Sequence, residues 1–183
     1  MLNSIVGLLG NGVVAGDYQS IATVSVTGAT SASIVFSSIP ATYSHLQIRG
    51  IARGDSTNYM DVWMNGDTTQ SKYAYHYLRG DGTSASSGGS AASTRPFGGF
   101  TTTTSDTSGM FGATIIDLLD YTNTNKYKTL RSLAGADRNT TGGNIFFFSS
   151  LFMDTSAISS VTLQMQSGNF VQYSTFALYG IKG

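Results

Sequence analysis

The 183-residue sequence contains no cysteine and no glutamate, and its ten acidic residues are all aspartate. The absence of cysteine excludes structural disulfides, thiolate zinc sites and thiol nucleophiles. Glutamate and lysine commonly fill the exposed positions of helices, and the chain has none of the first and only four of the second. The sequence therefore predicts a fold that depends on neither helices nor disulfides.

Charge is also scarce. Only 11% of the residues are charged and the formal net charge is zero, whereas about 25% of residues are charged in a typical soluble domain. The ten basic residues are scattered along the chain. They offer no basic face to a phosphate backbone, so we do not expect a nucleic acid as a partner.

Residues that favour strands and turns take the place of the helix formers. Serine and threonine make up about a quarter of the chain. Tyrosine, phenylalanine, valine and isoleucine suit a pleated, half-buried surface. The 22 glycines suit turns with positive φ. This composition predicts an all-β fold.

Alternation of apolar and polar residues predicts about ten strands. We expect them within residues 20–26, 33–39, 45–53, 59–67, 72–82, 110–121, 126–138, 144–153, 157–166 and 173–182. Their spacing of roughly 8–14 residues favours an antiparallel β-sandwich, jelly-roll-like in its arrangement.

Three local features add detail to this prediction. Gly50 is expected to mark a bulge that resets the alternation and turns Ile51 inward. The pair Asn65-Gly66 is a strong signal for a tight turn. The strand at 144–153 is apolar on both faces, which predicts a strand that is buried on both sides.

The chain is expected to hold one domain. An N-terminal arm at 1–17 precedes a sandwich domain at 18–183. Within that domain, residues 81–109 are rich in glycine, serine and threonine and predict one long loop. Such a loop is either mobile or held by a partner, and its segment "FGGFTTTT" can form an edge strand.

The arm carries seven large aliphatic residues: Leu2, Ile5, Val6, Leu8, Leu9, Val13 and Val14. It lacks the basic start of a signal peptide and the run of about 20 apolar residues that spans a bilayer, so we expect no membrane partner. It is interpreted either as a flexible tail or as an anchor that orders only against a neighbouring subunit. The amount of aliphatic surface favours the anchor.

The sequence shows no convincing site for catalysis, a metal or a cofactor. His45 and His76 lie on separate predicted strands without a spaced metal-binding partner. Glycoside hydrolysis needs two carboxylates at a set separation. Asp61, Asp117 and Asp120 are the candidates, but the last two would face opposite sides of a regular strand. We therefore expect neither enzymatic activity nor a cofactor.

Two Arg-Gly-Asp triplets follow predicted strands, at 53–55 and 79–81. They suit either a receptor-binding loop or an ordinary turn, and turn chemistry is the favoured interpretation. Carbohydrate recognition through Trp63 and the tyrosines is a further alternative, because sandwich loops commonly host such sites. A lone tryptophan within a strand pattern is nevertheless more often a core residue.

Two segments of the predicted sandwich domain, one near its start in the sequence and one at its end, resemble known proteins. The segment "SIPATYSHLQIRGIAR" at 38–53 and the segment "FALYGI" at 176–181 resemble runs in small β-rich proteins of tailed bacteriophage particles. In those proteins a Ser-Ile-Pro-x-x-Tyr-x-x-Leu-x-Ile-Arg run near the start pairs with a closing Phe-x-Leu-Tyr-Gly-Ile run. The match covers about a sixth of this chain.

Proteins of this kind are similar to capsid decoration (cement) proteins and to tail-fibre or head-binding modules, which are typically jelly rolls that act as trimers. The resemblance implies a structural protein on the surface of a phage virion. As a decoration protein, its partners would be the major capsid protein and copies of itself in a homotrimer. A tail-fibre or receptor-binding module that binds a host glycan is the alternative. The resemblance supplies no catalytic residues.

Overall fold

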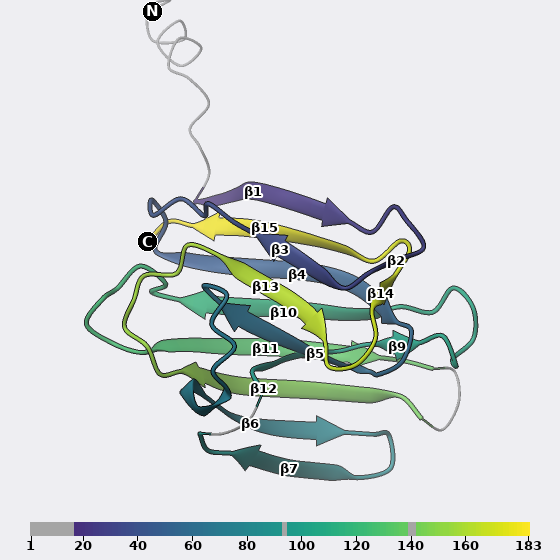
Figure 1. Cartoon of the computed structure of the whole chain (residues 1–183). Helices are drawn as coiled ribbons and strands as arrows, with labels where there is room; N and C mark the ends of the chain where they lie inside the picture. The colour runs from purple at the N-terminus through teal and green to yellow at the C-terminus, as the bar shows by residue number, and fades with distance from the viewer. Residues whose placement is uncertain (1–16, 93–94, 139–141) are drawn as a thin grey trace, which may run out of the picture.

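The computed structural model describes residues 17–92, 95–138 and 142–183 (Figure 1). These residues form fifteen strands and one short 3-10 turn, η1 at Gln70–Lys72. The strands are β1 (Tyr18–Ser25), β2 (Thr30–Ser31), β3 (Ser33–Phe36), β4 (His45–Gly54), β5 (Tyr59–Met64), β6 (Tyr73–Gly80), β7 (Ala85–Ser90), β8 (Phe97–Phe100), β9 (Thr102–Thr103), β10 (Gly112–Leu119), β11 (Lys128–Ala136), β12 (Asn144–Phe152), β13 (Val161–Met165), β14 (Phe170–Val171) and β15 (Thr175–Ile181). The predicted all-β class is confirmed, with more strands than the ten expected.

The strands form two packed antiparallel sheets, which confirms the predicted β-sandwich. The large sheet has the strand order β1-β15-β4-β10-β11-β12-β6-β7, and the small sheet has the order β3-β13-β5-β8. The short strands β2, β9 and β14 attach beside β4, and the β4–β9 pairing is parallel. In Figure 1, β3, β13 and β5 lie over the large sheet, and β6 and β7 form its lower edge.

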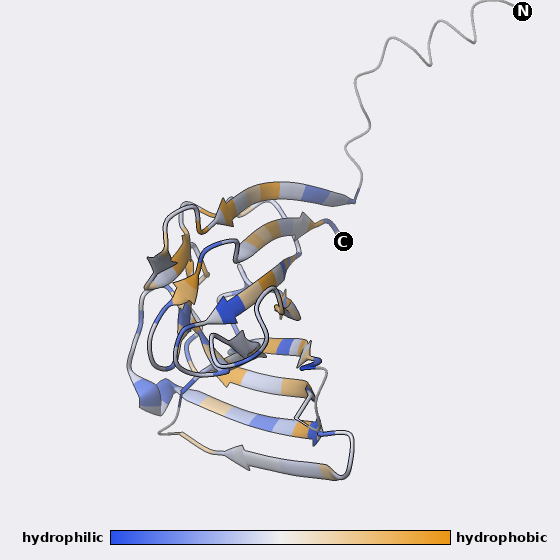
Figure 2. Ribbon diagram, turned by 90° about the vertical axis from the view of Figure 1, so that its right-hand side faces the viewer, coloured by the Kyte–Doolittle hydropathy of each residue, from blue (hydrophilic) through white to orange (hydrophobic). Residues whose placement is uncertain are grey.

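The core lies between the two sheets. Along β4, the residues Leu46, Ile48 and Ala52 are buried on the inner face, and the residues between them point to the outer face. Figure 2 shows this alternation of hydrophobic and hydrophilic residues along the strands. Each fully buried aliphatic or aromatic side chain stabilises the fold by about 1.5–3 kcal/mol relative to its exposed state.

A separate aromatic cluster lies where β8 meets β11 and β12. Its members share ring contacts across the two sheets: Tyr59, Tyr77, Phe97, Phe100, Phe146 and Phe148. The rings of Phe146 and Phe148 are stacked with their centroids 5.0 Å apart. Tyr73, Tyr75 and Tyr77 of β6 point into this side of the sheet, and His76 between the last two is exposed on the other side.

Gly50 does not mark a bulge, so the predicted reset of the alternation in β4 is wrong. The register of β4 with β10 and with β15 runs through Gly50 without a shift. Gly50 instead leaves room for an aromatic ring, because a Cβ atom there would lie 2.1 Å from Cδ1 of Phe176. As a consequence Ile51 points outward and is 56% exposed.

Residues 81–109 are not one long loop, as the low-complexity composition predicted. They contain β7, which pairs with β6, and β8, which pairs with β5 as an edge strand of the small sheet. Glycines let β7 lie close to β6, because a Cβ atom at Gly88 would be 2.7 Å from the Tyr77 hydroxyl. The tight turn predicted at Asn65-Gly66 is confirmed, with φ values of 51° and 67°.

Candidate functional site

The outer face of the large sheet carries an apolar surface that no described residue covers. We call it the outer patch, and its members are Ile51, Leu78, Ile115, Leu133, Ile145 and Phe147. Each of these side chains has an exposed fraction between 38% and 57%. They come from five adjacent strands, β4, β10, β11, β12 and β6.

Strand register brings the members of the outer patch together. Ile115 lies opposite Leu133, Leu133 lies opposite Phe147, and Phe147 lies opposite Leu78. Directly opposite residues on one sheet face have Cβ atoms about 4.5–5.5 Å apart, so these four side chains form a continuous row across the strands. Ile51 and Ile145 lie in the neighbouring row on the same face.

The outer patch has the area of the largest apolar surface on a typical monomer. Side chains of this size have roughly 150–200 Å² of surface each, and about half of each is exposed, which leaves on the order of 500 Å² of apolar area open. The largest such area on a typical monomer is about 300–600 Å², and areas of this kind mark interaction sites. The outer patch therefore has the size and chemistry of a docking surface.

The prediction that residues 144–153 are buried on both faces is wrong for the isolated chain. In β12, Phe146, Phe148 and Phe152 are buried against the small sheet, whereas Ile145 and Phe147 are exposed on the outer face. The apolar residues on both faces of this strand remain informative, because such a strand is typical of a sheet covered on both sides. The described residues cover only one of them.

A polar row borders the outer patch. In register across the strands it contains Gln47, Asp117, Arg131, Ser149 and His76. The Gln47 side-chain amide donates to Asp117 Oδ1 at 2.7 Å. This row gives the apolar surface a hydrophilic margin, as in protein interfaces with an apolar centre and a polar rim.

An aromatic pair lies at the β1 end of the same face. The rings of Tyr18 and Tyr179 stack with centroids 4.8 Å apart, and the Arg49 guanidinium lies 5.2 Å from the Tyr18 ring centroid. The Tyr18 hydroxyl donates to Gln47 Oε1, and Arg49 Nε donates to the same oxygen at 2.7 Å. The start of β1 is thereby fixed onto the outer face.

An open depression adjoins the outer patch at the other end of the strands. Its volume is about 650 Å³, and its lining includes Ile145 of the outer patch together with Gly80 and Gly135 of the same row. Asp81 and Asn144 also line it. Arg79 is bound to both of these polar side chains, through a 2.6 Å hydrogen bond to Asn144 Oδ1 and a 3.7 Å contact with Asp81 Oδ2.

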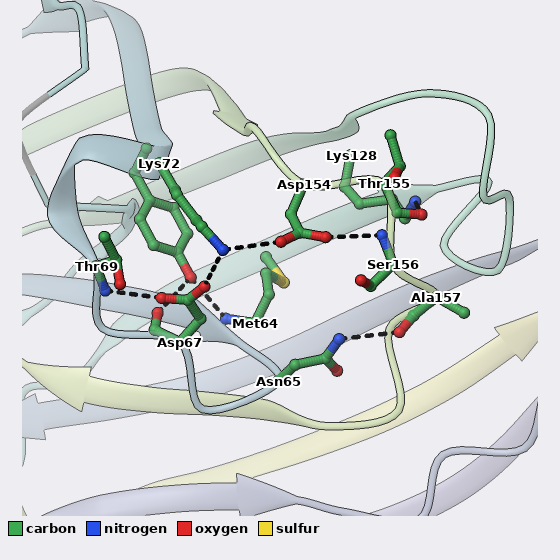
Figure 3. Close-up of polar contacts among 11 residues, drawn as sticks. Met64, Asn65, Asp67, Thr69, Lys72, Lys128, Asp154, Thr155, Ser156 and Ala157 are labelled. Carbon is green, nitrogen blue, oxygen red and sulfur yellow. Dashed lines mark hydrogen bonds and ion pairs between the residues drawn. The ribbon is translucent and has the colours of Figure 1, made fainter.

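The clearest polar cluster is a structural clamp at one end of the sandwich (Figure 3). Lys72 Nζ donates to Asp67 Oδ2 at 2.7 Å and to Asp154 Oδ2 at 2.8 Å. These hydrogen bonds lower the pKa of both carboxyl groups and raise the pKa of Lys72. A general acid needs the opposite shift, so this carboxylate pair serves to join the turn after β5 to the segment after β12.

Lys128 lies beside this clamp and is buried. Its Nζ donates to the backbone carbonyl oxygens of Asn123, Lys126 and Thr155. Burial lowers the pKa of Lys128. The three carbonyl oxygens satisfy the three donors of an ammonium group, so the residue ties the β10–β11 hairpin to the segment after β12.

Asp61 is the one candidate carboxylate whose side chain is fully removed from water. Its side chain is fully buried, Arg95 Nε lies 2.7 Å from Oδ2, and the Gln166 side-chain amide donates to Oδ1 at 2.9 Å. Burial raises the pKa of Asp61 to about 6. Both oxygens are engaged inside the protein, and Asp117 and Asp120 lie on the other sheet, so the three predicted carboxylates are not brought together.

The first Arg-Gly-Asp triplet is part of the fold. The Arg53 guanidinium is buried and donates to the backbone oxygens of Thr103, Asp106 and Thr107 at 2.8–3.2 Å. Asp55 accepts hydrogen bonds from the backbone and side chain of Asn169. In the second triplet, Asp81 accepts bonds from the backbone N–H groups of Thr83 and Ser84, which is turn chemistry.

The remaining predicted site residues are dispersed. Trp63 is buried in the core with its ring edge-on to Tyr73. His45 accepts a hydrogen bond from the backbone N–H of Asp120 at 3.0 Å, and His76 lies exposed on the outer face. Among the described residues, no group of three or more histidine or acidic side chains is placed to hold a metal ion.

The predicted anchor residues lie outside the described part of the chain. They are Leu2, Ile5, Val6, Leu8, Leu9, Val13 and Val14. The sequence did not identify the outer patch. Its only signal was the two-sided apolarity of residues 110–121 and 144–153.

Comparison with protein-family models gives no match, and comparison with curated protein sequences gives none either. In the part of the chain that the structure describes, no helix is long and apolar enough to cross a membrane.

Proposed function

We propose that this chain is a structural subunit of a bacteriophage particle, a capsid decoration protein that bridges and stabilises coat subunits on the particle surface as a homotrimer. The observation that carries the proposal is the outer patch, an apolar surface on a sheet whose opposite face is already buried. Apolar surfaces of this size often mark the sites at which proteins interact.

The apolar area supplies a free energy comparable to the cost of association. At about 25 cal/mol per Å², on the order of 500 Å² of apolar contact corresponds to about 12 kcal/mol, before association costs on the order of 4–15 kcal/mol. The polar row around the patch adds area toward the roughly 800 Å² per partner of a standard interface. A subunit repeated many times over a shell multiplies this contribution.

The two segments that resemble phage proteins support the virion assignment. They lie at opposite ends of the sequence, yet β4 and β15 are neighbours in the large sheet, with Leu178 opposite Ile48. Leu46 and Ile48 of the first segment and Phe176 and Leu178 of the second face the core, whereas Arg49 and Tyr179 lie together on the outer face. The resemblance therefore falls on one continuous structural unit.

The test uses particles assembled without this protein. Added wild-type protein should bind them and raise the temperature at which the shells rupture. The double variant Leu133→Ser/Phe147→Ser should fold normally and bind at least tenfold more weakly. The control is Val35→Ser, which changes an exposed side chain of β3 on the small sheet. Equal binding by the double variant and the wild type would contradict the proposal.

A receptor-binding module of the phage tail is the second candidate, and one observation favours it. Stacked Tyr18 and Tyr179, with Gln47 and Asp117 beside them, present rings and hydrogen-bonding groups of the kind that bind sugars. This candidate predicts specific hits for the isolated protein on a glycan array, lost in Tyr18→Ala. An array without hits removes it.

A further inference from the structure

The outer patch needs an occupant that is apolar and carries little charge. Arg49 lies in the row of Ile115, Asp117 and Arg131 lie in the bordering polar row, and Asp81 lines the adjoining depression. Packing the same face of a second copy against the outer patch would take these charged side chains out of water, which costs free energy unless each is paired. An uncharged aliphatic segment carries no such penalty.

Residues 1–16 of this chain have that chemistry. They contain seven large aliphatic side chains and no charged side chain, since the first charged residue of the sequence is Asp17. Sixteen residues can extend over roughly 50 Å. The outer patch runs across five strands spaced about 4.8 Å apart, a distance of roughly 20 Å. The segment is therefore long enough to cover the patch.

The direction of β1 favours a patch on another copy over the patch of the same chain. Tyr18, the first residue of β1, lies opposite Ile181, and Ser25, its last residue, lies opposite Thr175. Thr175 shares its row with Ile51 of the outer patch. The patch is therefore beside the end of β1, whereas the chain before Tyr18 leaves from the start of that strand. A segment that continues in the line of the strand leads away from its own patch, and it would have to turn back across the sheet to reach that patch.

We propose that residues 1–16 of a neighbouring copy of this chain occupy the outer patch. Each subunit then lends its N-terminal segment to the next, and the seven aliphatic side chains complete the second apolar face of the large sheet. This inference rests on the proposed function in one respect, because it requires the outer patch to be a subunit interface. It goes further by naming the occupant.

The experiment uses the absence of cysteine. A Leu133→Cys variant of the full chain, labelled with a benzophenone maleimide, carries one photo-crosslinker in the outer patch. The labelled chains are then unfolded and refolded together with wild-type chains, which contain no cysteine and are grown in ¹⁵N. Asp-N protease cleaves before Asp17 and releases residues 1–16 as a single peptide, which mass spectrometry identifies with its isotope content.

The expected result is a crosslink from position 133 to residues 1–16 that includes the ¹⁵N form of that peptide. A deletion of residues 2–14 should abolish this crosslink and weaken self-association at least tenfold in sedimentation velocity. The variant Leu8→Ser/Leu9→Ser should weaken it in the same direction, and Asn11→Ser should not. These two variants keep the whole chain and give a readout that does not depend on the truncation.

Three outcomes overturn the inference. A crosslink only to the ¹⁴N peptide would show that the segment covers its own patch. A crosslink to another part of a second copy, or to a coat protein, would refute the occupant named here but leave the outer patch as an interface and the proposed function standing. A monomeric protein without crosslinks, which also fails to bind particles, would contradict both.

Discussion

At the scale of single residues, the charge of the Asp61 side chain depends on the fold. It is fully buried between Arg95 and Gln166, and burial outweighs the attraction of Arg95 and raises its pKa to about 6. An unfolded aspartate has a pKa near 3.9. Between about pH 4 and pH 6 the folded protein therefore holds a proton that the unfolded chain has released.

This difference predicts a pH dependence of stability. Proton binding to the folded state makes the Asp61 contribution favourable below about pH 4, and it is lost as the pH rises through about 6. The free energy of unfolding of the wild type, minus that of Asp61→Asn, should fall by on the order of 2–3 kcal/mol between pH 4 and pH 7. Urea unfolding at a series of pH values measures both proteins.

Asp81→Asn provides the control of opposite sign. Hydrogen bonds from the backbone of Ser84 and Thr83 lower the pKa of Asp81, so its contribution is present above the unfolded pKa and lost as the pH falls. The corresponding difference should therefore rise with pH. An Asp61→Asn difference that stays constant, or that rises with pH, would contradict the account of Asp61.

At the scale of elements, the fit of β4 against β15 depends on Gly50. A Cβ atom at this position would lie 2.1 Å from Cδ1 of Phe176, so a side chain forces the ring or the strand to move. We expect Gly50→Val to destabilise the protein by about 2–4 kcal/mol. Chemical denaturation measures the loss.

Two further variants test the reason for that loss. Combining Gly50→Val with Phe176→Leu should cost less than the sum of the two single changes, because the smaller side chain makes room. Gly28→Ala should be nearly neutral, since no atom lies within 4 Å of a Cβ there. Simple additivity of the two changes would show that the contact between the ring and Gly50 is not the cause.

The sequence predicted the strands and turns better than it predicted which side chains pack against them. The alternation in β4, β6 and β15 and the Asn65-Gly66 turn follow from local preferences, and the structure agrees with them. The strand β7 was missed because serine and glycine have no apolar alternation, although small residues are what lets it approach Tyr77. The reset at Gly50 was wrong because the ring that fills the space belongs to a strand 126 residues later, from Gly50 to Phe176.

The outer patch was beyond local prediction for a related reason. The apolar residues on both faces of β12 indicate burial, but the sequence does not say which face the chain itself covers. The structure shows that the small sheet takes Phe146, Phe148 and Phe152, and the other face remains open. Most of the predicted functional residues, by contrast, make structural contacts inside the fold, as Arg53 and Trp63 show.

At the scale of the whole molecule, the chain is a sandwich whose large sheet has one covered face and one uncovered face. The inner face of the large sheet is buried by the small sheet, and its outer face carries on the order of 500 Å² of open apolar surface. Net charge is zero, so charge repulsion does not keep copies apart. These properties are those that the proposed function requires, in which assembly completes the large sheet.

The most direct measurement is cysteine accessibility in the free and assembled protein. Single variants Leu133→Cys and Val35→Cys place one thiol on the outer patch and one on the exposed side of β3, in a chain without other thiols. Assembly should slow maleimide labelling at position 133 at least tenfold and leave labelling at position 35 unchanged. Equal labelling of position 133 in the free and assembled protein would contradict the account.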